Sequence, residues 1–339
     1  MKHKSFGISS LAAILVLTVN LNGAEADSNP FFPVKVKEKW GYMEVTGQLS
    51  IPPQFDEAKS FSEGLAQVRQ GKKWGYIDKK GKLAIEPGFE ENGPFSNGLA
   101  GVRIGGQWGY IDEKGKIVIQ PNFSQALKFS EGYGAVRAPS CCGGKWSFMD
   151  PKGEVLIKPN RFYADVKGFS EGLAPVLWNE GWGYIGKKKG FVIKPQFRSA
   201  EEFSEGLACV EFNDPDPHAT KYGYIDKTGR AITGHRFEAA GTFSEGIARV
   251  KLNNLWGYIK GRGKIVIKPQ FSRAEDFSGE LAAVNIGGKW GYVAKKGQIL
   301  VDPQFDWASP FSNGLALVRI GSRLKYIDTR GKVVRQFDE

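Results

Sequence analysis

Side chains that could do acid–base or metal chemistry are scarce in this chain of 339 residues. Beyond the extreme N-terminus the only histidines are His218 and His235, and neither has the spacing of a metal-ligand set or of a nucleophile with its base. Asn213, Asp214 and Asp216 offer oxygen ligands, but the segment lacks the glycine and the distal glutamate of a calcium loop. The residue types therefore predict no catalytic residue, no metal site and no cofactor.

Two sets of carboxylates recur along the chain. Glutamates occupy one position of a repeated Phe-Ser-Glu-Gly segment, and aspartates follow a repeated aromatic segment. They are Glu63, Glu131, Glu171, Glu205 and Glu245 in the first set, and Asp78, Asp112, Asp150, Asp226 and Asp328 in the second. Because each set holds the same place in every copy, and Asp commonly opens a type I turn, we interpret both sets as turn residues rather than catalytic acids.

The aromatic segment is a Trp-Gly-Tyr triplet that returns every 34 to 40 residues. Its copies begin at Trp40, Trp74, Trp108, Trp146, Trp182, Tyr222, Trp256 and Trp290, and a degraded copy begins at Leu324. A period of this length is typical of a tandem array in which each unit needs its neighbours to bury its apolar faces.

One copy contains three strand-like runs, Leu99–Arg103, Trp108–Ile111 and Lys116–Ile119. The first two are separated by Gly105-Gly106, which suits a tight hairpin, and a turn from Asp112 to Gly115 precedes the third. The sequence thus predicts an all-β domain over residues 27–339, made of about nine three-stranded antiparallel meanders.

Alternation predicts how the units pack. Trp108 and Tyr110 should point to one face, so that a ladder of such tryptophans holds the core. The third strand is apolar on both faces, which favours cover on both sides, and Gly109 should admit a neighbouring aromatic side chain. We expect an open superhelical stack, because propeller blades usually have four strands and three are found; a closed propeller-like ring is the alternative.

The repeated Gly-Lys-Trp-Gly-Tyr-Ile-Asp segment, followed by Pro-x-Phe and Phe-Ser-x-Gly-Leu-Ala, resembles the bacterial WG-repeat (KWG-repeat) proteins. The resemblance covers nearly all of the chain after residue 26. It implies an all-β repeat, often exported or associated with the envelope, with no established activity and no catalytic residues to carry over. The sixth copy departs from the pattern at Tyr222 and Gly234, and the last copy departs at Leu324 and Lys325, as a terminal cap would.

The N-terminus has the features of a signal peptide over residues 1–26. A basic start precedes an apolar run from Ile8 to Leu21, which is too short for a spanning helix, and Ala24-Glu25-Ala26 offers a cleavage site. We therefore expect export, with cleavage near Ala26 and no membrane span afterwards. Whether the mature chain stays in the periplasm, on the cell surface or outside the cell is left open.

The three cysteines do not predict a disulfide scaffold. Cys141 and Cys142 are adjacent in the fourth repeat, and Cys209 lies two repeats further on. At about 10 Å per stacked sheet, Cys209 would be beyond the ~7 Å reach of a bridge. A bridge between the two adjacent cysteines and free thiols both remain open.

The charge favours an anionic partner. The net charge of +11 becomes +10 when residues 1–26, with two lysines and one glutamate, are removed. In an exported protein this indicates wall polymers, lipid head groups or acidic glycans rather than nucleic acid, with solubility as the alternative explanation.

Candidate binding residues follow from the repeat. A column of cations occupies equivalent positions just after the first strand, which predicts a basic stripe; its members are Arg69, Arg103, Arg137 and Arg319, with Lys35 and Lys251 in the same column. Trp178 and Trp307 lie outside the Trp-Gly positions and either stack on a sugar ring or fill the core.

The predicted function is therefore that of an exported, non-enzymatic binding or scaffold protein for an envelope polymer or a protein partner. Two insertions, Ala138–Lys145 and Asn213–Lys221, enlarge the same loop of the fourth and sixth repeats. The alternative function is a hydrolase-type enzyme with its catalytic groups on these two loops.

Overall fold

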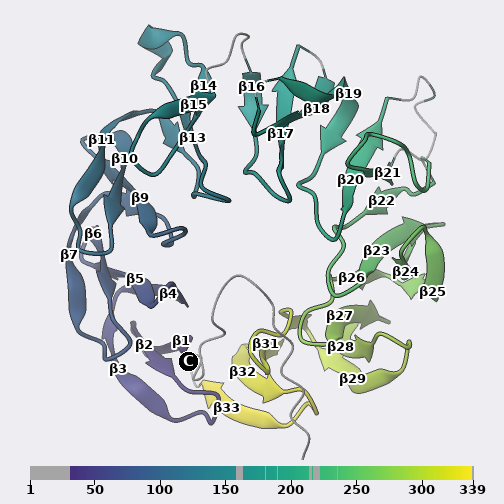
Figure 1. The fold of residues 1–339 in the computed structure, drawn as a ribbon. Helices are drawn as coiled ribbons and strands as arrows, with labels where there is room; N and C mark the ends of the chain where they lie inside the picture. Colours follow the sequence, from purple (N-terminus) through teal and green to yellow (C-terminus); the bar gives the residue numbers. More distant parts are fainter. Residues whose placement is uncertain are drawn as a thin grey trace, which may run out of the picture.

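The structure, a computed structural model, describes residues 31–157, 163–179, 181–188, 190–213, 216, 222–234 and 236–337. The signal peptide predicted over residues 1–26 lies outside these ranges. The described residues form antiparallel strands and one short 3₁₀ helix, η1 (Ser140–Cys142). The strands make eight sheets, arranged in a closed ring around a central opening (Figure 1). The predicted all-β class is confirmed.

The strands follow the ring in chain order. The first sheet contains β1 (Phe32–Val36), β2 (Lys39–Met43) and β3 (Leu49–Phe55). The second contains β4 (Glu57–Ser62), β5 (Leu65–Gln70), β6 (Lys73–Ile77) and β7 (Leu83–Phe89). The third contains β8 (Glu91–Asn92), β9 (Leu99–Ile104), β10 (Gln107–Asp112) and β11 (Ile117–Phe123). The fourth sheet is β12 (Gln125–Ala126), β13 (Gly134–Arg137), β14 (Trp146–Met149) and β15 (Val155–Ile157). A six-stranded sheet follows, with β16 (Tyr163–Val166), β17 (Leu173–Trp178), β18 (Gly181–Gly186), β19 (Phe191–Ala200), β20 (Leu207–Phe212) and β21 (Tyr222–Asp226). The last three are β22 (Ala239–Ala240), β23 (Ile247–Leu252), β24 (Leu255–Lys260) and β25 (Lys264–Phe271); β26 (Arg273–Ala274), β27 (Leu281–Ile286), β28 (Lys289–Ala294) and β29 (Ile299–Phe305); and β30 (Trp307–Ala308), β31 (Leu315–Ile320), β32 (Arg323–Asp328) and β33 (Val333–Phe337).

The three predicted strands of the third repeat are present as β9, β10 and β11. Gly105 and Gly106 turn the chain between β9 and β10 with φ of 57° and 78°, values that glycine adopts without strain. The prediction of three strands per unit was incomplete, because the connector adds a fourth. Residues just after Pro-x-Phe form β8, which pairs with β9 of the following unit. The count of three strands per unit, which favoured an open stack, is therefore wrong.

Nine units occupy the eight sheets because two units share one sheet. β19 pairs with β18 through Phe197 and continues to Ala200, where it pairs with Val210 of β20. The units of Trp182 and Tyr222 are thus joined by one continuous strand. In the second of these units the residue that aligns with the connector proline of most copies is His235, not Gly234 as expected, since the proline follows the first residue of the triplet by 13 positions.

The glycine after each tryptophan has a different role from the one predicted. A Cβ on Gly109 would lie 2.5 Å from the Ile119 carbonyl oxygen and 2.7 Å from the Pro121 nitrogen. The close neighbour is therefore the backbone of the third strand in the same unit, not an aromatic ring of the next one. The pairing of β10 with β11 shifts register at this point, and only glycine lets the two backbones approach so closely.

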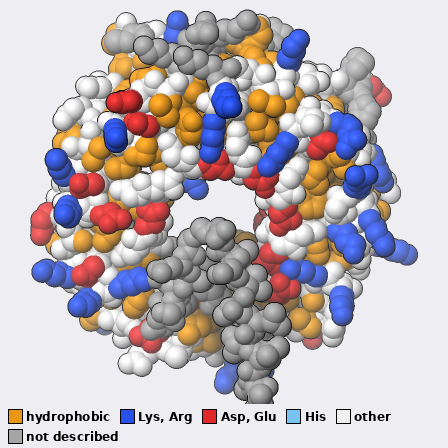
Figure 2. Space-filling model, viewed as in Figure 1, with side chains coloured by type: hydrophobic (Ala, Val, Ile, Leu, Met, Phe, Trp, Pro, Cys, Tyr) orange, Lys and Arg blue, Asp and Glu red, His pale blue; other side chains and the backbone are white. Residues whose placement is uncertain are grey.

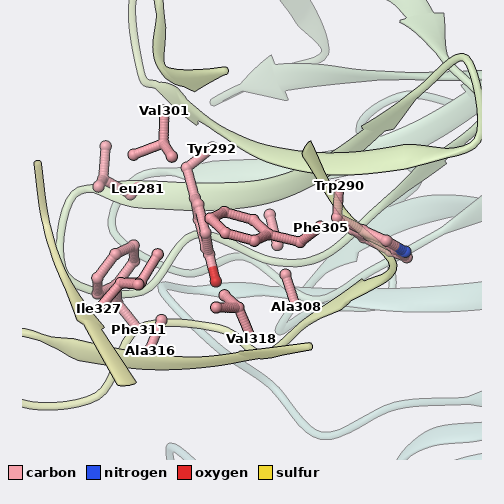
Figure 3. Close-up of a cluster of buried hydrophobic side chains, with 11 residues drawn as sticks. Leu281, Trp290, Tyr292, Val301, Phe305, Ala308, Phe311, Ala316, Val318 and Ile327 are labelled. Carbon is pink, nitrogen blue, oxygen red and sulfur yellow. The ribbon is translucent and has the colours of Figure 1, made fainter. Parts of the chain in front are cut away.

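The core between units is built on tyrosine more than on tryptophan. Tyr110 is 1% exposed, and its ring centroid lies 4.9 Å from that of Phe129 in the next connector. Its hydroxyl donates a hydrogen bond to the Leu127 carbonyl at 2.6 Å. Figure 3 shows the same arrangement around Tyr292. Trp108, by contrast, is only half-buried, so the predicted tryptophan ladder is a secondary part of the core.

The third strand was predicted to be covered on both sides, but the structure leaves one side exposed. Ile117 and Val118 are 37% and 36% exposed, and only Ile119 is buried, at 6%. The reason is position: in the four-stranded sheets the third strand lies at the outer circumference, while the short connector strand lies nearest the opening (Figure 1). The apolar outer strand is an edge of the sheet rather than a layer between two others.

The ring closes between the last sheet and the first, so the closed alternative is the observed geometry and the open superhelical stack is not. Tyr326 packs edge-on against Phe32 at 5.7 Å, and its hydroxyl donates to the Pro33 carbonyl at 3.3 Å. Arg335 also donates to the Gly47 carbonyl at 2.7 Å. The degraded last copy keeps the tyrosine that makes the contact between units, and this tyrosine joins the two ends of the chain.

We predict that the tyrosine of a repeat contributes more to stability than its tryptophan. Tyr110→Ala should cost about 3–5 kcal/mol, as expected for a fully buried large side chain, and Trp108→Ala should cost roughly half of that. Trp307→Ala should cost less than about 1 kcal/mol, because this side chain is 42% exposed. Urea unfolding of the three variants measures the order, and equal losses at Trp108 and Tyr110 would contradict it.

Candidate functional site

The predicted cation column exists as a shared register position. Each member lies directly opposite the first residue of the Trp-Gly-Tyr triplet, as Arg69 does opposite Trp74 and Arg103 opposite Trp108. On the other side of the first strand, the connector strand places a residue opposite every cation except Lys35, whose sheet has no connector strand among the described residues. The residue at that connector position determines how far the charge of the cation is neutralised.

Carboxylates offset two of the column arginines. Arg69 Nη2 lies 2.5 Å from Glu57 Oε1, and Arg103 forms an ion pair with Glu91. Both glutamates are the cross-strand partners of their arginines in the register.

The other two arginines of the predicted site have neutral cross-strand partners. Arg137 donates to Gln125 Oε1 at 3.3 Å and, through Nε, to the Gly144 carbonyl at 3.0 Å. Arg319 is exposed and lies opposite Trp307, which is itself exposed. Neither arginine has a carboxylate directly opposite it in the connector strand, although Asp306, the residue before Trp307, is near enough to Arg319 for this cation to help lower its pKa.

Closure of the ring changes the neighbours of Arg319. In sequence it is the last member of the column, but the last sheet packs against the first, where Lys35 holds the same position opposite Trp40. Five successive sheets therefore carry a cation at this position. We call them the cation arc: Arg319, Lys35, Arg69, Arg103 and Arg137. Lys251 lies outside the arc, because the units on either side of it have no cation at this position. The three remaining units carry Leu177, Glu211 and Asn285 there.

The two unusual tryptophans differ from each other. Trp178 is half-buried on β17, packs against the core and has its ring centroid 5.8 Å from that of Phe191. Its surroundings match the core-filling interpretation. Trp307 is 42% exposed on β30 and is available for stacking beside Arg319.

The repeated glutamates join neighbouring units, a role that the turn interpretation did not include. Glu63 has a left-handed backbone, with φ of 50°, and its carboxylate accepts hydrogen bonds from the amides of Asn97 and Gly98 at 2.8 and 2.9 Å. The partners lie in the same turn of the next unit. Four further glutamates bond in the same way: Glu131, Glu171, Glu205 and Glu245. The sequence contains a signal for this role, because each of these glutamates is followed 34 to 41 residues later by the turn glycine whose amide it binds.

Figure 2 shows the electrostatic result on one face. Aspartate and glutamate side chains border much of the central opening, whereas most lysines and arginines lie toward the outer circumference. On this face, the border of the opening is thus more acidic than the outer circumference.

Two of the repeated glutamates have lowered pKa values. Burial raises the pKa of Glu131, but hydrogen bonds from Lys187 and from the Gly172 amide outweigh it, and the net direction is downward. Glu245 is similar, with burial opposed by Lys295 and by the amides of Glu280 and Gly279. These carboxylates stay ionised in the folded protein.

The enlarged loops yield little chemistry in the described residues. The loop of the fourth repeat forms η1 and is tied to Arg137 through Gly144. In the sixth repeat Asn213 donates to the Gln196 carbonyl at 2.8 Å, while Asp214, His218 and His235 lie outside the described residues. In the part of the chain that is described, no three His, Cys, Asp or Glu residues are grouped as a metal site.

Cys209 is a core residue. It is 3% exposed on β20, and its thiol donates to the Ala240 carbonyl at 3.6 Å. Burial raises the pKa of this thiol to about 12, so it stays protonated and unreactive at neutral pH.

We predict that the glutamate bonds between units are lost in acid. A lowered folded-state pKa means that the unfolded chain takes up protons first, so the stabilisation is present above the ordinary Glu value of 4.5 and disappears as the pH falls below it. Glu131→Gln combined with Glu245→Gln should lower the melting temperature by a few degrees at pH 7 and by little at pH 3. The exposed pair Glu113→Gln with Glu154→Gln is the matched control, and a constant difference across pH would contradict the assignment.

The described part of the chain contains no helix with the length and apolarity needed to span a membrane. Comparison with curated proteins gives no match.

Similar solved structures include Hsv2p of Kluyveromyces lactis, at 10% identity and a TM-score of 0.43 over 70% of this chain and 91% of that one. PorZ of Porphyromonas gingivalis, described as a bacterial surface component of the type-IX secretion system, is 9% identical with a TM-score of 0.36, over 84% of this chain and 44% of its own. Tricorn protease is 11% identical with a TM-score of 0.43, over 89% and 43%. At these values the likeness supports no inference about activity.

The model of the WG containing repeat matches residues 40–74, 74–108, 108–138, 146–179, 182–214, 222–256, 256–290 and 290–323. These matches run from the first Trp-Gly-Tyr triplet to Arg323, just before the degraded copy that begins at Leu324, and they confirm the resemblance drawn from the triplet and its connector. The chain belongs to the family of proteins built from the WG containing repeat.

Proposed function

We propose that this protein is an exported, non-enzymatic binding or scaffold protein whose partner is an anionic envelope polymer or an acidic protein surface. The observation that supports the proposal is the cation arc, which passes through the ring closure with Arg319 beside the exposed Trp307. Cations held at one register position on adjacent sheets suit a polymer with regularly spaced anionic groups.

The arc is not uniform, and its composition indicates where binding is strongest. Glu57 and Glu91 offset Arg69 and Arg103, while Arg137 and Arg319 face neutral residues of the connector strand. Lys35 lies 3.9 Å from the exposed Glu38, and Asp306 lies near Arg319. An approaching anion therefore gains most at the closure and at the fourth sheet. Trp307 adds an exposed ring that can stack on a sugar, which favours an acidic glycan over a lipid head group.

Export is part of the proposal and rests on residues 1–26, with their basic start, short apolar run and small-residue cleavage site. The hydrolase alternative places its catalytic groups on the enlarged loops of the fourth and sixth repeats, and Asp216 is the acidic residue described on the second of these loops. We favour binding because the cation arc supports it.

The test replaces the four column arginines with glutamine. Arg69→Gln, Arg103→Gln, Arg137→Gln and Arg319→Gln together should weaken binding to an insoluble envelope fraction, and to polygalacturonate as a defined acidic glycan, by at least about tenfold. Binding of the unmodified protein should fall as salt rises, because exposed charges are screened beyond roughly 8–10 Å. Cosedimentation across a salt titration measures both effects.

A matched control removes the same charge elsewhere. Arg198, Arg230, Arg262 and Arg330 are exposed and outside the column, so their replacement by glutamine should leave binding largely intact. The unfolding midpoint of the control variant should change little, since exposed charges add little stability. That of the column variant should fall slightly, because Arg69, Arg103 and Arg137 are half-buried and form ion pairs or hydrogen bonds. Equal binding by the two variants at every salt concentration would contradict a role of the cation arc in binding. The positive charge would then be explained by solubility.

A further inference from the structure

The interface between the last and first sheets differs from its neighbours at one repeated position. At the preceding interface Trp290 is 6% exposed and packs in one cluster with Ala308 and Val318 of the next sheet (Figure 3). At the closure the equivalent residue is Leu324, which is 38% exposed. A side chain with the area of an indole is thus replaced by a smaller one where the ring closes.

A pocket of about 300 Å³ lies at this interface. Its walls are apolar and aromatic, with Val34 and Trp40 from the first sheet and Leu324, Tyr326 and Phe337 from the last. The volume is at the lower end of the range of small-molecule sites. We call it the closure pocket.

The first sheet leaves this region less filled than the others do. In the last sheet, Ala308 of the connector strand β30 pairs with Val318 and packs against Trp290. The equivalent of Val318 in the first sheet is Val34, opposite Gly41, and the described residues of that sheet form three strands without a connector strand. Among the described residues, the indole that fills the other interface is therefore replaced by a smaller side chain here, and no short connector strand is present beside β1.

Charge at the mouth of the pocket selects the ligand further. Lys35 and Lys37 line it together with Glu38, and Lys35 Nζ lies 3.9 Å from Glu38 Oε2. Two cations against one carboxylate favour an anionic group at the mouth, while the aromatic walls favour a flat ring inside.

We propose that the closure pocket binds a small planar aromatic anion, with the ring in the place that tryptophan occupies at the other interface and the anionic group beside Lys35 and Lys37. This goes beyond the proposed polymer binding, since the ligand is a free small molecule and the four column arginines are not needed to enclose it.

The experiment uses the full chain and indole-3-acetate as the probe, with binding followed by calorimetry and by ligand-observed NMR. Leu324→Trp restores the side chain of the other repeats, and it should fill the pocket and weaken binding by at least tenfold without lowering the melting temperature. Leu300→Trp makes the same change at a residue that is 46% exposed on the outer strand β29, and it should leave binding unchanged. If Leu324→Trp does not fold, Leu324→Phe takes its place, with a smaller but measurable loss.

The charge component has its own test. Lys35→Gln with Lys37→Gln should weaken indole-3-acetate several-fold and remove the salt dependence of its binding, and tryptamine, which carries a cation on the same ring, should bind more weakly than the acid. Failure of the probe to bind, or equal binding by the Leu324→Trp and Leu300→Trp variants, overturns the proposal. Binding that appears only after the residues before Phe31 are removed would assign the pocket to that segment of the chain and overturn it as well.

Discussion

One buried hydrogen bond recurs between neighbouring units and controls how they pack, except at the fourth unit, where Phe148 stands in place of the tyrosine and has no hydroxyl. The tyrosine of a triplet donates to a connector carbonyl 17 residues later, as Tyr76 does to Gly93 and Tyr258 to Glu275. That connector then supplies the innermost strand of the following sheet, so a single side chain fixes both the packing and the relative rotation of two sheets. Burial raises the pKa of these phenols, to about 12 at Tyr326, and the hydroxyl therefore remains a donor at any physiological pH.

Two further side chains of each unit reach the same neighbour. Ser96 donates to the Phe129 carbonyl at 2.7 Å, and Glu63 accepts from the amides of the next turn. All three contacts run from one unit to the following one and recur at most of the described interfaces, which gives those interfaces a similar geometry. Similar rotations added around the chain either close or form a helix, and here they close after nine units. The last tyrosine then finds Pro33 as the equivalent of the connector carbonyl.

The local part of the fold could be predicted from the sequence, and the part that depends on distant partners could not. Gly105-Gly106 and Asp112–Gly115 define their turns through their own backbone preferences, so the strands between them were predicted correctly. The fourth strand was missed because Glu91 and Asn92 show no strand pattern and pair only once the next unit is in place. The sequence did not predict that Tyr110 is more buried than Trp108, because alternation places both side chains on one face of the strand and does not indicate which lies deeper in the core. In the candidate site, the arginine register followed from the period, but the glutamates that offset Arg69 and Arg103 come from the strand that was not foreseen.

Closure also changes what a degraded terminal repeat means. In an open stack the loss of Trp-Gly at Leu324 and Lys325 would adapt an end to solvent, and Arg319 would stand far from Lys35. In the ring the same residues face another sheet, so the smaller Leu324 leaves space at an interface, and Arg319 becomes the neighbour of Lys35. This interface is also the one that no chain connection bridges, because it joins the first and last sheets. It is therefore the place where sequence can depart from the repeat pattern without disturbing the geometry of the other units, and where a binding site can be built at least cost to the fold.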